Sequence, residues 1–145
     1  MNLLVTGGVA DERRRVALAF HHESPQRLGP FVSVCCGREE ARLAAGLESW
    51  ASDNEASSAD PLRAAQGGTL FLDEVGCLSS DTQRLLLIFV RHLAGAADDD
   101  GPPVRLAAGH EEDLDAAAAE GAFSPPLLDY LDKIHVELGS VRGAA

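Results

Sequence analysis

Two adjacent carboxylates, Asp73 and Glu74, follow a short apolar run and are the residues of this chain best suited to chemistry. The segment from Gly67 to Gly76 runs Gly-Gly-Thr-Leu-Phe-Leu-Asp-Glu-Val-Gly, which predicts a buried strand over 69–73 with both acids at its carboxyl end. At the open edge of a sheet, an aspartate can hold Mg²⁺ and a glutamate can orient an attacking water. The spacing therefore suggests phosphoryl chemistry at one end of a sheet.

The usual partner of such a strand is a phosphate-cradling loop of the form Gly-x-x-x-x-Gly-Lys-Ser/Thr, and the sequence lacks it. A predicted strand over 3–6 instead ends in Gly7-Gly8, and the basic cluster 13–15 opens the helix that follows. We interpret this cluster as a solvated face neutralised by Asp11 and Glu12. Binding of phosphate or of an acidic partner is the alternative, because basic residues at a helix start oppose its macrodipole.

The elements that must position these residues alternate between short apolar runs and helical patterns. Strands are predicted over 3–6, 31–35, 69–73, 104–108 and 134–138, and helices over 11–22, 39–50, 80–93, 113–119 and 127–131. Loops are predicted over 52–61 and 97–103. This alternation predicts an α/β fold, a three-layer structure with a parallel five-stranded sheet covered by helices on both faces.

Three local patterns refine these elements. In the first helix, Val16, Ala19 and Phe20 form the expected buried face. Ser80, with Gln83 three residues later, predicts a capping box. The pair Pro125-Pro126 predicts a break in the chain before the last helix.

Composition excludes several classes of function. The 145 residues carry a net charge of −11, which opposes direct binding of this segment to nucleic acid. Cys35, Cys36 and Cys77 show no metal-ligand spacing, and they fit a reducing, cytoplasmic setting. Neither a charged leader nor a long apolar stretch is present, so we expect no membrane insertion. His21 and His22 point in different directions on a helix, so they do not converge on one metal ion, and we expect them on the surface or at a helix end.

Taken in order, these segments resemble the central AAA+ domain of bacterial enhancer-binding proteins, the activators of sigma-54 RNA polymerase. The resemblance runs from about Leu3 to Leu138. It depends on Ser24-Pro25, Gly29-Pro30-Phe31-Val32, Gly67 to Gly76 and Gln83-Arg84-Leu85-Leu86. It implies a P-loop NTPase core, here without the helical lid, in which 69–74 is the Walker B strand.

The phosphate loop departs from this family. The family's Gly-Glu-Ser-Gly-Thr-Gly-Lys aligns with residues 7–13, where only the first glycine is kept and Arg13 replaces the lysine. Carboxylates at Asp11 and Glu12 would face a polyanion. One such pair about 4 Å apart costs up to about 4 kcal/mol at an effective dielectric constant near 20, which weakens binding roughly a thousandfold. Arg13 would recover part of this loss.

Other family motifs are also missing. The Gly-Ala-Phe-Thr-Gly-Ala loop that engages sigma-54 has no counterpart in 48–61. Glu111, beside His110, takes the place of the sensor I asparagine, and the arginine fingers fall on Ser124 and Tyr130.

The resemblance thus implies a single degenerate sigma-54-interaction-type domain over 1–145, a transcription-regulatory module that acts by protein contact with little or no ATP hydrolysis. Gly7, Gly8 and Arg13 would form a degenerate phosphate loop. Asp73 and Glu74 would form an inactive Walker B-like pair, an inherited strand end whose carboxylates lie in solvent. No cofactor is expected, and Asp73 would hold Mg²⁺ only if nucleotide binds. The expected partner is an intact sigma-54 activator or the protein's own oligomer.

Two alternatives stay open. In the first, the chain is a divergent ATPase that uses Mg²⁺-ATP through Arg13, Asp73 and Glu74. In the second, it is a fragment of a longer DNA-binding regulator.

Overall fold

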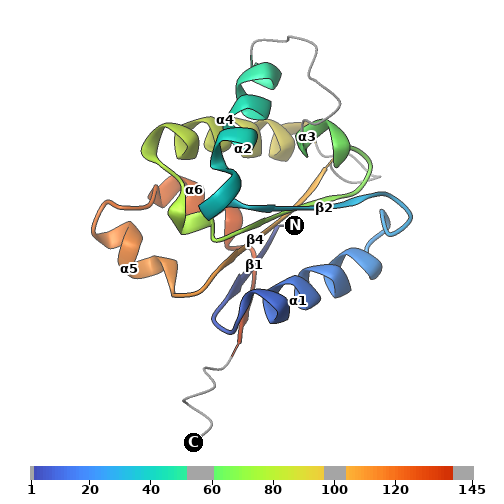
Figure 1. Cartoon of the computed structure of the whole chain (residues 1–145), viewed down its shortest axis with the longest axis horizontal. Coiled ribbons are helices and arrows are strands. Elements are labelled where there is room, and N and C mark those ends of the chain that lie inside the picture. The colour runs from blue at the N-terminus through green and yellow to red at the C-terminus, as the bar shows by residue number, and fades with distance from the viewer. Residues whose placement is uncertain (1, 52–60, 97–103, 139–145) are drawn as a thin grey trace, which may run out of the picture.

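A five-stranded parallel sheet forms the centre of the molecule (Figure 1), as the alternation of strands and helices predicted. The computed structural model describes residues 2–51, 61–96 and 104–138. The strands lie in the order β2-β3-β4-β1-β5. Their bounds are β1 Leu3–Thr6, β2 Phe31–Cys35, β3 Thr69–Asp73, β4 Arg105–His110 and β5 Ile134–Glu137. Because all strands are parallel, their carboxyl ends meet at one edge of the sheet, where ligands bind in open α/β folds.

Helices cover both faces of the sheet unequally. Helix α1 packs on one face of the sheet, where its Ala17 forms a small cluster with Leu3, Val5, Phe71 and Ala107. The larger core lies on the other face, under the long helices α2 and α4 and the shorter α6. The helix bounds are α1 Ala10–His22, α2 Cys36–Ala51, α3 Pro61–Ala64, α4 Ser80–Ala96, α5 Leu114–Ala119 and α6 Pro125–Leu131, with a 3₁₀ turn, η1, at Val75–Cys77.

The buried face of α1 differs from the predicted one. Ala19 is exposed, and Val16 and Phe20 are only half-buried. The residues that face the sheet are Arg13, Ala17 and His21, spaced four apart. The apolar pattern missed this stripe because two of its three members are polar and are satisfied by partners distant in sequence.

His21 is one of these. It lies at the end of α1, one of its two expected positions, but its side chain is buried and not on the surface. Its Nδ1 lies 2.8 Å from Thr69 Oγ1, and its Nε2 lies 3.1 Å from the carbonyl oxygen of Gly29. The neighbouring His22 is exposed. His21 therefore ties the end of α1 to the start of β3.

Two other local predictions are wrong. Gln83 makes no capping box with Ser80, because its amide turns inward and donates to the carbonyl of Leu78 at 2.8 Å and of Ala122 at 3.2 Å. The two prolines do not break the chain, since α6 begins at Pro125, where a missing N–H costs nothing. Elements α3 and η1 were not predicted, and the loops expected over 52–61 and 97–103 lie outside the described residues except for Pro61.

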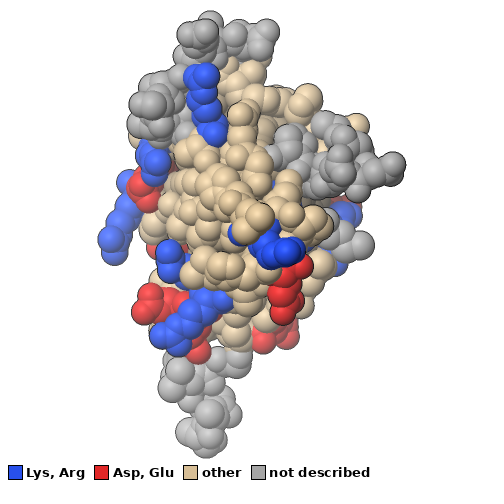
Figure 2. Space-filling model, turned by 90° about the vertical axis from the view of Figure 1, so that its right-hand side faces the viewer, with Lys and Arg blue, Asp and Glu red and all other residues tan. Residues whose placement is uncertain are grey.

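Charge is not segregated on the side of the molecule shown in Figure 2. Lys and Arg side chains lie interspersed with Asp and Glu around a broad uncharged area. That side therefore offers no continuous basic track of the kind that a nucleic-acid backbone requires.

Candidate nucleotide site

The turn after β1 presents carbonyl oxygens where phosphate loops present N–H groups. Gly7 and Gly8 have φ angles of 87° and 62°, a left-handed conformation that glycine adopts without strain. The Gly7 N–H donates to the carbonyl of His110 at 3.0 Å, which ties the turn to β4. The carbonyl oxygens of Gly7 and Gly8 instead accept hydrogen bonds from Arg13 Nη1 at 3.1 and 2.9 Å. The turn therefore suits a cation, whereas a phosphate site needs converging donors.

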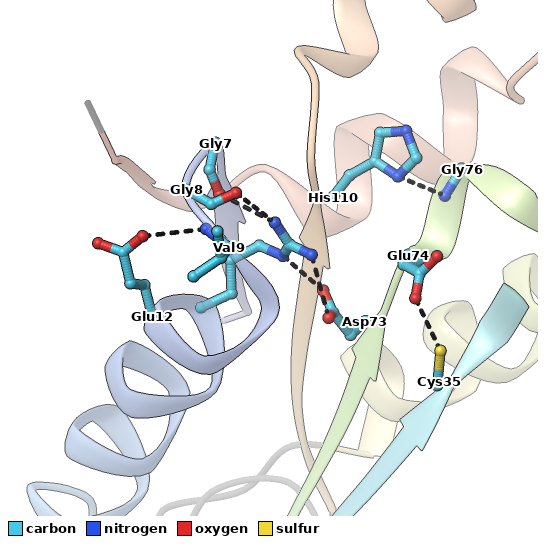
Figure 3. Close-up of polar contacts among 10 residues, drawn as sticks. Gly7, Gly8, Val9, Glu12, Cys35, Asp73, Glu74, Gly76 and His110 are labelled. Carbon is cyan, nitrogen blue, oxygen red and sulfur yellow. Dashed lines mark hydrogen bonds and ion pairs between the residues drawn. The ribbon is translucent and has the colours of Figure 1, made fainter. Parts of the chain in front are cut away.

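Arg13 supplies that cation from within the chain. Its Nε donates to Asp73 Oδ1 at 2.7 Å and its Nη2 to Asp73 Oδ2 at 3.3 Å, a two-pronged ion pair (Figure 3). The side chains of Arg13 and Asp73 are only 5% and 9% exposed. The guanidinium therefore lies between the turn after β1 and the end of β3, and a planar fork matches a carboxylate in this way.

This arrangement corrects two expectations. Arg13 is neutralised by Asp73, 60 residues away, and not by Asp11 or Glu12. The carboxylate of Asp73 is buried and paired, so it does not simply lie in solvent. Because both oxygens of Asp73 already accept from Arg13, the site does not fit Mg²⁺ while this ion pair holds.

The Glu12 side chain accepts a hydrogen bond from a backbone N–H that a bound anion would need. Its Oε1 accepts from the N–H of Val9 at 3.0 Å, directly before the first turn of α1. Free N–H groups at a helix start are the groups that bind phosphate. Asp11 is exposed on the first turn. The Glu12 carboxylate therefore adds a negative charge to the loop and accepts a hydrogen bond from one of the loop's backbone amides.

Glu74 is turned away from this network. Its backbone has φ 55° and ψ 40°, and its Oε2 accepts from Cys35 Sγ at 2.8 Å, at the end of β2. Burial raises the pKa of the Cys35 thiol, and the hydrogen bond to Glu74 raises it further, so the thiol keeps its proton. In Figure 3, Glu74 points toward Cys35 and Asp73 toward the turn after β1.

His110 is a neighbour of the site to which the sequence assigned no role. It ends β4, between the turn after β1 and the end of β3, and its Nδ1 accepts from the N–H of Gly76 at 3.3 Å. Only its place beside Asp73 in the folded sheet identifies it, since no motif marks it. Glu111 is exposed, Ser124 caps α6, and the Tyr130 carbonyl accepts from Asn2 Nδ2. The expected sensor and finger positions thus contribute no contact to the Arg13–Asp73 network.

The position of His110 predicts a pH dependence of stability. Burial lowers the pKa of His110 below its ordinary value of 6.5; Glu112 opposes this effect and Arg13 adds to it. The folded state thus binds fewer protons than the unfolded state just below pH 6.5. The stability from neutral His110 is complete above that value and is lost as the pH falls toward the folded pKa. Between about pH 7.5 and 5.5, urea unfolding should show a smaller loss of stability in His110→Gln than in wild type. The exposed His22→Gln should behave like wild type, and an equal loss in both variants would contradict the assignment.

The structure brings Gly7, Gly8, Arg13 and Asp73 into one hydrogen-bonded network and leaves Glu74 outside it. Their roles in nucleotide binding stay predictions. Within the described ranges, no cluster of three or more His, Cys, Asp or Glu side chains could hold a metal ion. No helix of the described part is both long and apolar enough to cross a bilayer.

Known sequences match nearly the whole chain. The sequence model of the Sigma-54 interaction domain matches residues 1–137. The transcriptional regulatory protein GlrR of Escherichia coli K12 is 30% identical over 148 residues, which cover 95% of this chain and 33% of GlrR. The DNA-binding transcriptional regulator NtrC of Rhizobium meliloti is 28% identical over 154 residues, covering 100% of this chain and 32% of NtrC. The chain spans about a third of the length of these curated relatives.

Solved structures agree with the fold. NtrX from Brucella abortus, in complex with ATP, superposes with a TM-score of 0.74 and 26% identity, over 95% of this chain and 31% of that one. The P-loop NTPase domain of the sigma-54 transport activator from E. coli has a TM-score of 0.60 and 19% identity, over 94% of this chain and 82% of that one. The latter likeness establishes the fold alone.

Proposed function

The chain belongs to the Sigma-54 interaction domain family, and we propose that within this family it regulates transcription by protein contact, with little or no ATP hydrolysis. The observation that carries the proposal is the Arg13 guanidinium, which is bound at once by the carbonyls of Gly7 and Gly8 and by both oxygens of Asp73. The Arg13 guanidinium thus lies between the turn after β1 and the end of β3.

ATP and Mg²⁺ would have to displace this internal ligand. Phosphoryl transfer depends almost entirely on the positioning of phosphate, metal and water by the protein. Moving Arg13 away would leave Asp73 as a buried unpaired charge, which costs several kcal/mol unless a metal replaces the arginine. Nucleotide would also meet Glu12 at the loop, with its carboxylate already on the Val9 N–H. Favourable contacts with phosphate would have to offset these costs before nucleotide could bind.

The scaffold itself is kept. The sheet, the ion-paired end of β3 and the covering helices form an α/β core similar to that of NtrX from Brucella abortus. We propose that residues 1–145 act as a single unit whose partner is an intact sigma-54 activator or another copy of this chain. Entry of such a subunit into an activator assembly would lower the fraction of subunits that hydrolyse ATP.

Mixing tests this proposal. Increasing amounts of this chain, added to an intact activator of the family, should co-elute with it on gel filtration and lower its ATPase rate in proportion to the fraction of complex. An activator variant without its catalytic glutamate provides the baseline rate. An unchanged rate together with no complex would refute contact with an activator.

A divergent ATPase is the second candidate, favoured by the retained Asp73 and Glu74 at the carboxyl end of β3. It requires Arg13 to leave Asp73 and Glu74 to leave Cys35. It predicts turnover that Glu74→Gln abolishes, whereas the contact proposal predicts no turnover in either protein.

A further inference from the structure

Strand β5 forms one edge of the sheet, and its outer side is free among the described residues. It pairs only with β1. The N–H groups of Ile134 and Leu138 donate to the carbonyls of Asn2 and Thr6, at 3.0 and 2.7 Å. Alternate residues of a strand direct their backbone groups to opposite sides. The N–H and C=O groups of His135 and Glu137 therefore point outward, away from β1.

The side chains of this edge divide into two kinds. Ile134 and Val136 are in register with Leu3 and Val5, so they lie on the face that carries α1. Ile134 is 38% exposed and is one of four large apolar side chains exposed in the described ranges. Another of the four, Val9, follows Gly8, which lies against the Leu138 side chain. The edge thus carries an apolar strip on one face.

Charges of opposite sign mark the two ends of the other face. Lys133 directly precedes β5 and Glu137 ends it, and both side chains are exposed. Neither takes part in an ion pair with any described residue. Between them, His135 Nε2 lies 2.7 Å from Thr6 Oγ1, and its Nδ1 lies 3.6 Å from Asp132 Oδ1. A strand that is positive at its start and negative at its end complements an antiparallel copy of itself.

We propose that two copies of this chain associate through β5, paired antiparallel about a two-fold axis at Val136. In this register His135 lies opposite the partner's Glu137, and each such pair exchanges both of its outward N–H···O bonds. Val136 lies opposite its own copy, and Ile134 lies opposite Leu138. Lys133 becomes the diagonal neighbour of Glu137 on the other copy, within reach of a long side chain.

The opposite edge of the sheet lacks these features. Strand β2 contains Phe, Val, Ser, Val and Cys and carries no charged side chain. A pairing through four-residue β5 buries little surface, so the dimer is weak and depends on concentration. This pairing rests on the part of the proposed function in which the partner is another copy of the chain. Because it uses neither the Arg13 site nor an activator, its failure can be distinguished from a failure of contact with an activator.

Charge exchange tests the pairing by sedimentation equilibrium over a concentration series up to about 1 mM. Lys133→Glu and Glu137→Lys should each weaken dimerisation about tenfold, because like charges then meet across the axis. The double variant has the wild-type net charge and should restore the wild-type constant. Arg91→Glu, an exposed change of equal charge on α4, is the matched control and should change the constant little.

Proline supplies an independent variant. Glu137→Pro removes an outward N–H without touching a bond to β1, and proline is tolerated on edge strands in this position. It should abolish the dimer while circular dichroism shows the wild-type fold. A protein that stays monomeric at the highest concentration, association beyond a dimer, or a constant that the charge exchange leaves unchanged would overturn the proposal.

Discussion

Replacing Asp73 by asparagine should lower the free energy of unfolding by about 3–5 kcal/mol, the usual cost of breaking a buried ion pair from one side. The guanidinium of Arg13 is buried and has no other carboxylate in contact among the described residues. Asparagine keeps the shape of the side chain but leaves that charge uncompensated. Urea unfolding at neutral pH, with wild type measured alongside, gives the difference directly.

Two further variants distinguish the stability lost with the ion pair from nonspecific destabilisation by the substitution. Asp81→Asn removes an exposed pair in which Asp81 and Arg84 are 90% and 73% exposed, and it should leave stability nearly unchanged. The double change Arg13→Met with Asp73→Leu removes both charges and should recover most of the loss. If Asp73→Asn cost no more than Asp81→Asn, the buried pair would not be the stabilising feature described above.

Restoring the family's loop should create a nucleotide site. The triple variant Ala10→Gly, Glu12→Gly and Arg13→Lys supplies the missing glycines, removes one carboxylate and frees Asp73 from its internal partner. Relief of a like-charge contact alone corresponds to a gain of roughly a thousandfold in affinity. We expect Mg²⁺-ATP binding in the micromolar range, measured by calorimetry.

Adding Asp73→Asn to the triple variant is the control, because it should remove the Mg²⁺-dependent part of the binding. A triple variant that folds but binds Mg²⁺-ATP no better than wild type would show that the loop residues and Arg13 are not what excludes nucleotide.

Much of the fold could be predicted because its signals are local. Three of the four strands at the site have the predicted bounds, 3–6, 31–35 and 69–73, since each is an apolar run bounded by glycine, proline or acid. The fourth, β4, runs over 105–110 and not over the predicted 104–108. Membership of the Sigma-54 interaction domain family was also correctly predicted, because the segment from Gly67 to Gly76 keeps the residues of the family's motif. These features depend on neighbours in sequence.

The site could be predicted only in part, because its contacts are distant in sequence. Arg13 was identified as the residue in place of the lysine, but nothing near it indicates that it pairs with Asp73 across the sheet. The hydrogen bond from Cys35 to Glu74 spans 39 residues and likewise leaves no local pattern. His21 was expected on the surface or at a helix end; the helix end is correct, but its burial is recognisable only once Thr69 and Gly29 are seen beside it.

We propose that Arg13 already occupies the place where a nucleotide and its metal would bind. Calorimetric titration of the wild-type chain with Mg²⁺-ATP tests it most directly. The internal ion pair predicts a flat trace up to millimolar ATP. A saturable one-to-one isotherm in that range would contradict it, because nucleotide would then displace the arginine at little cost.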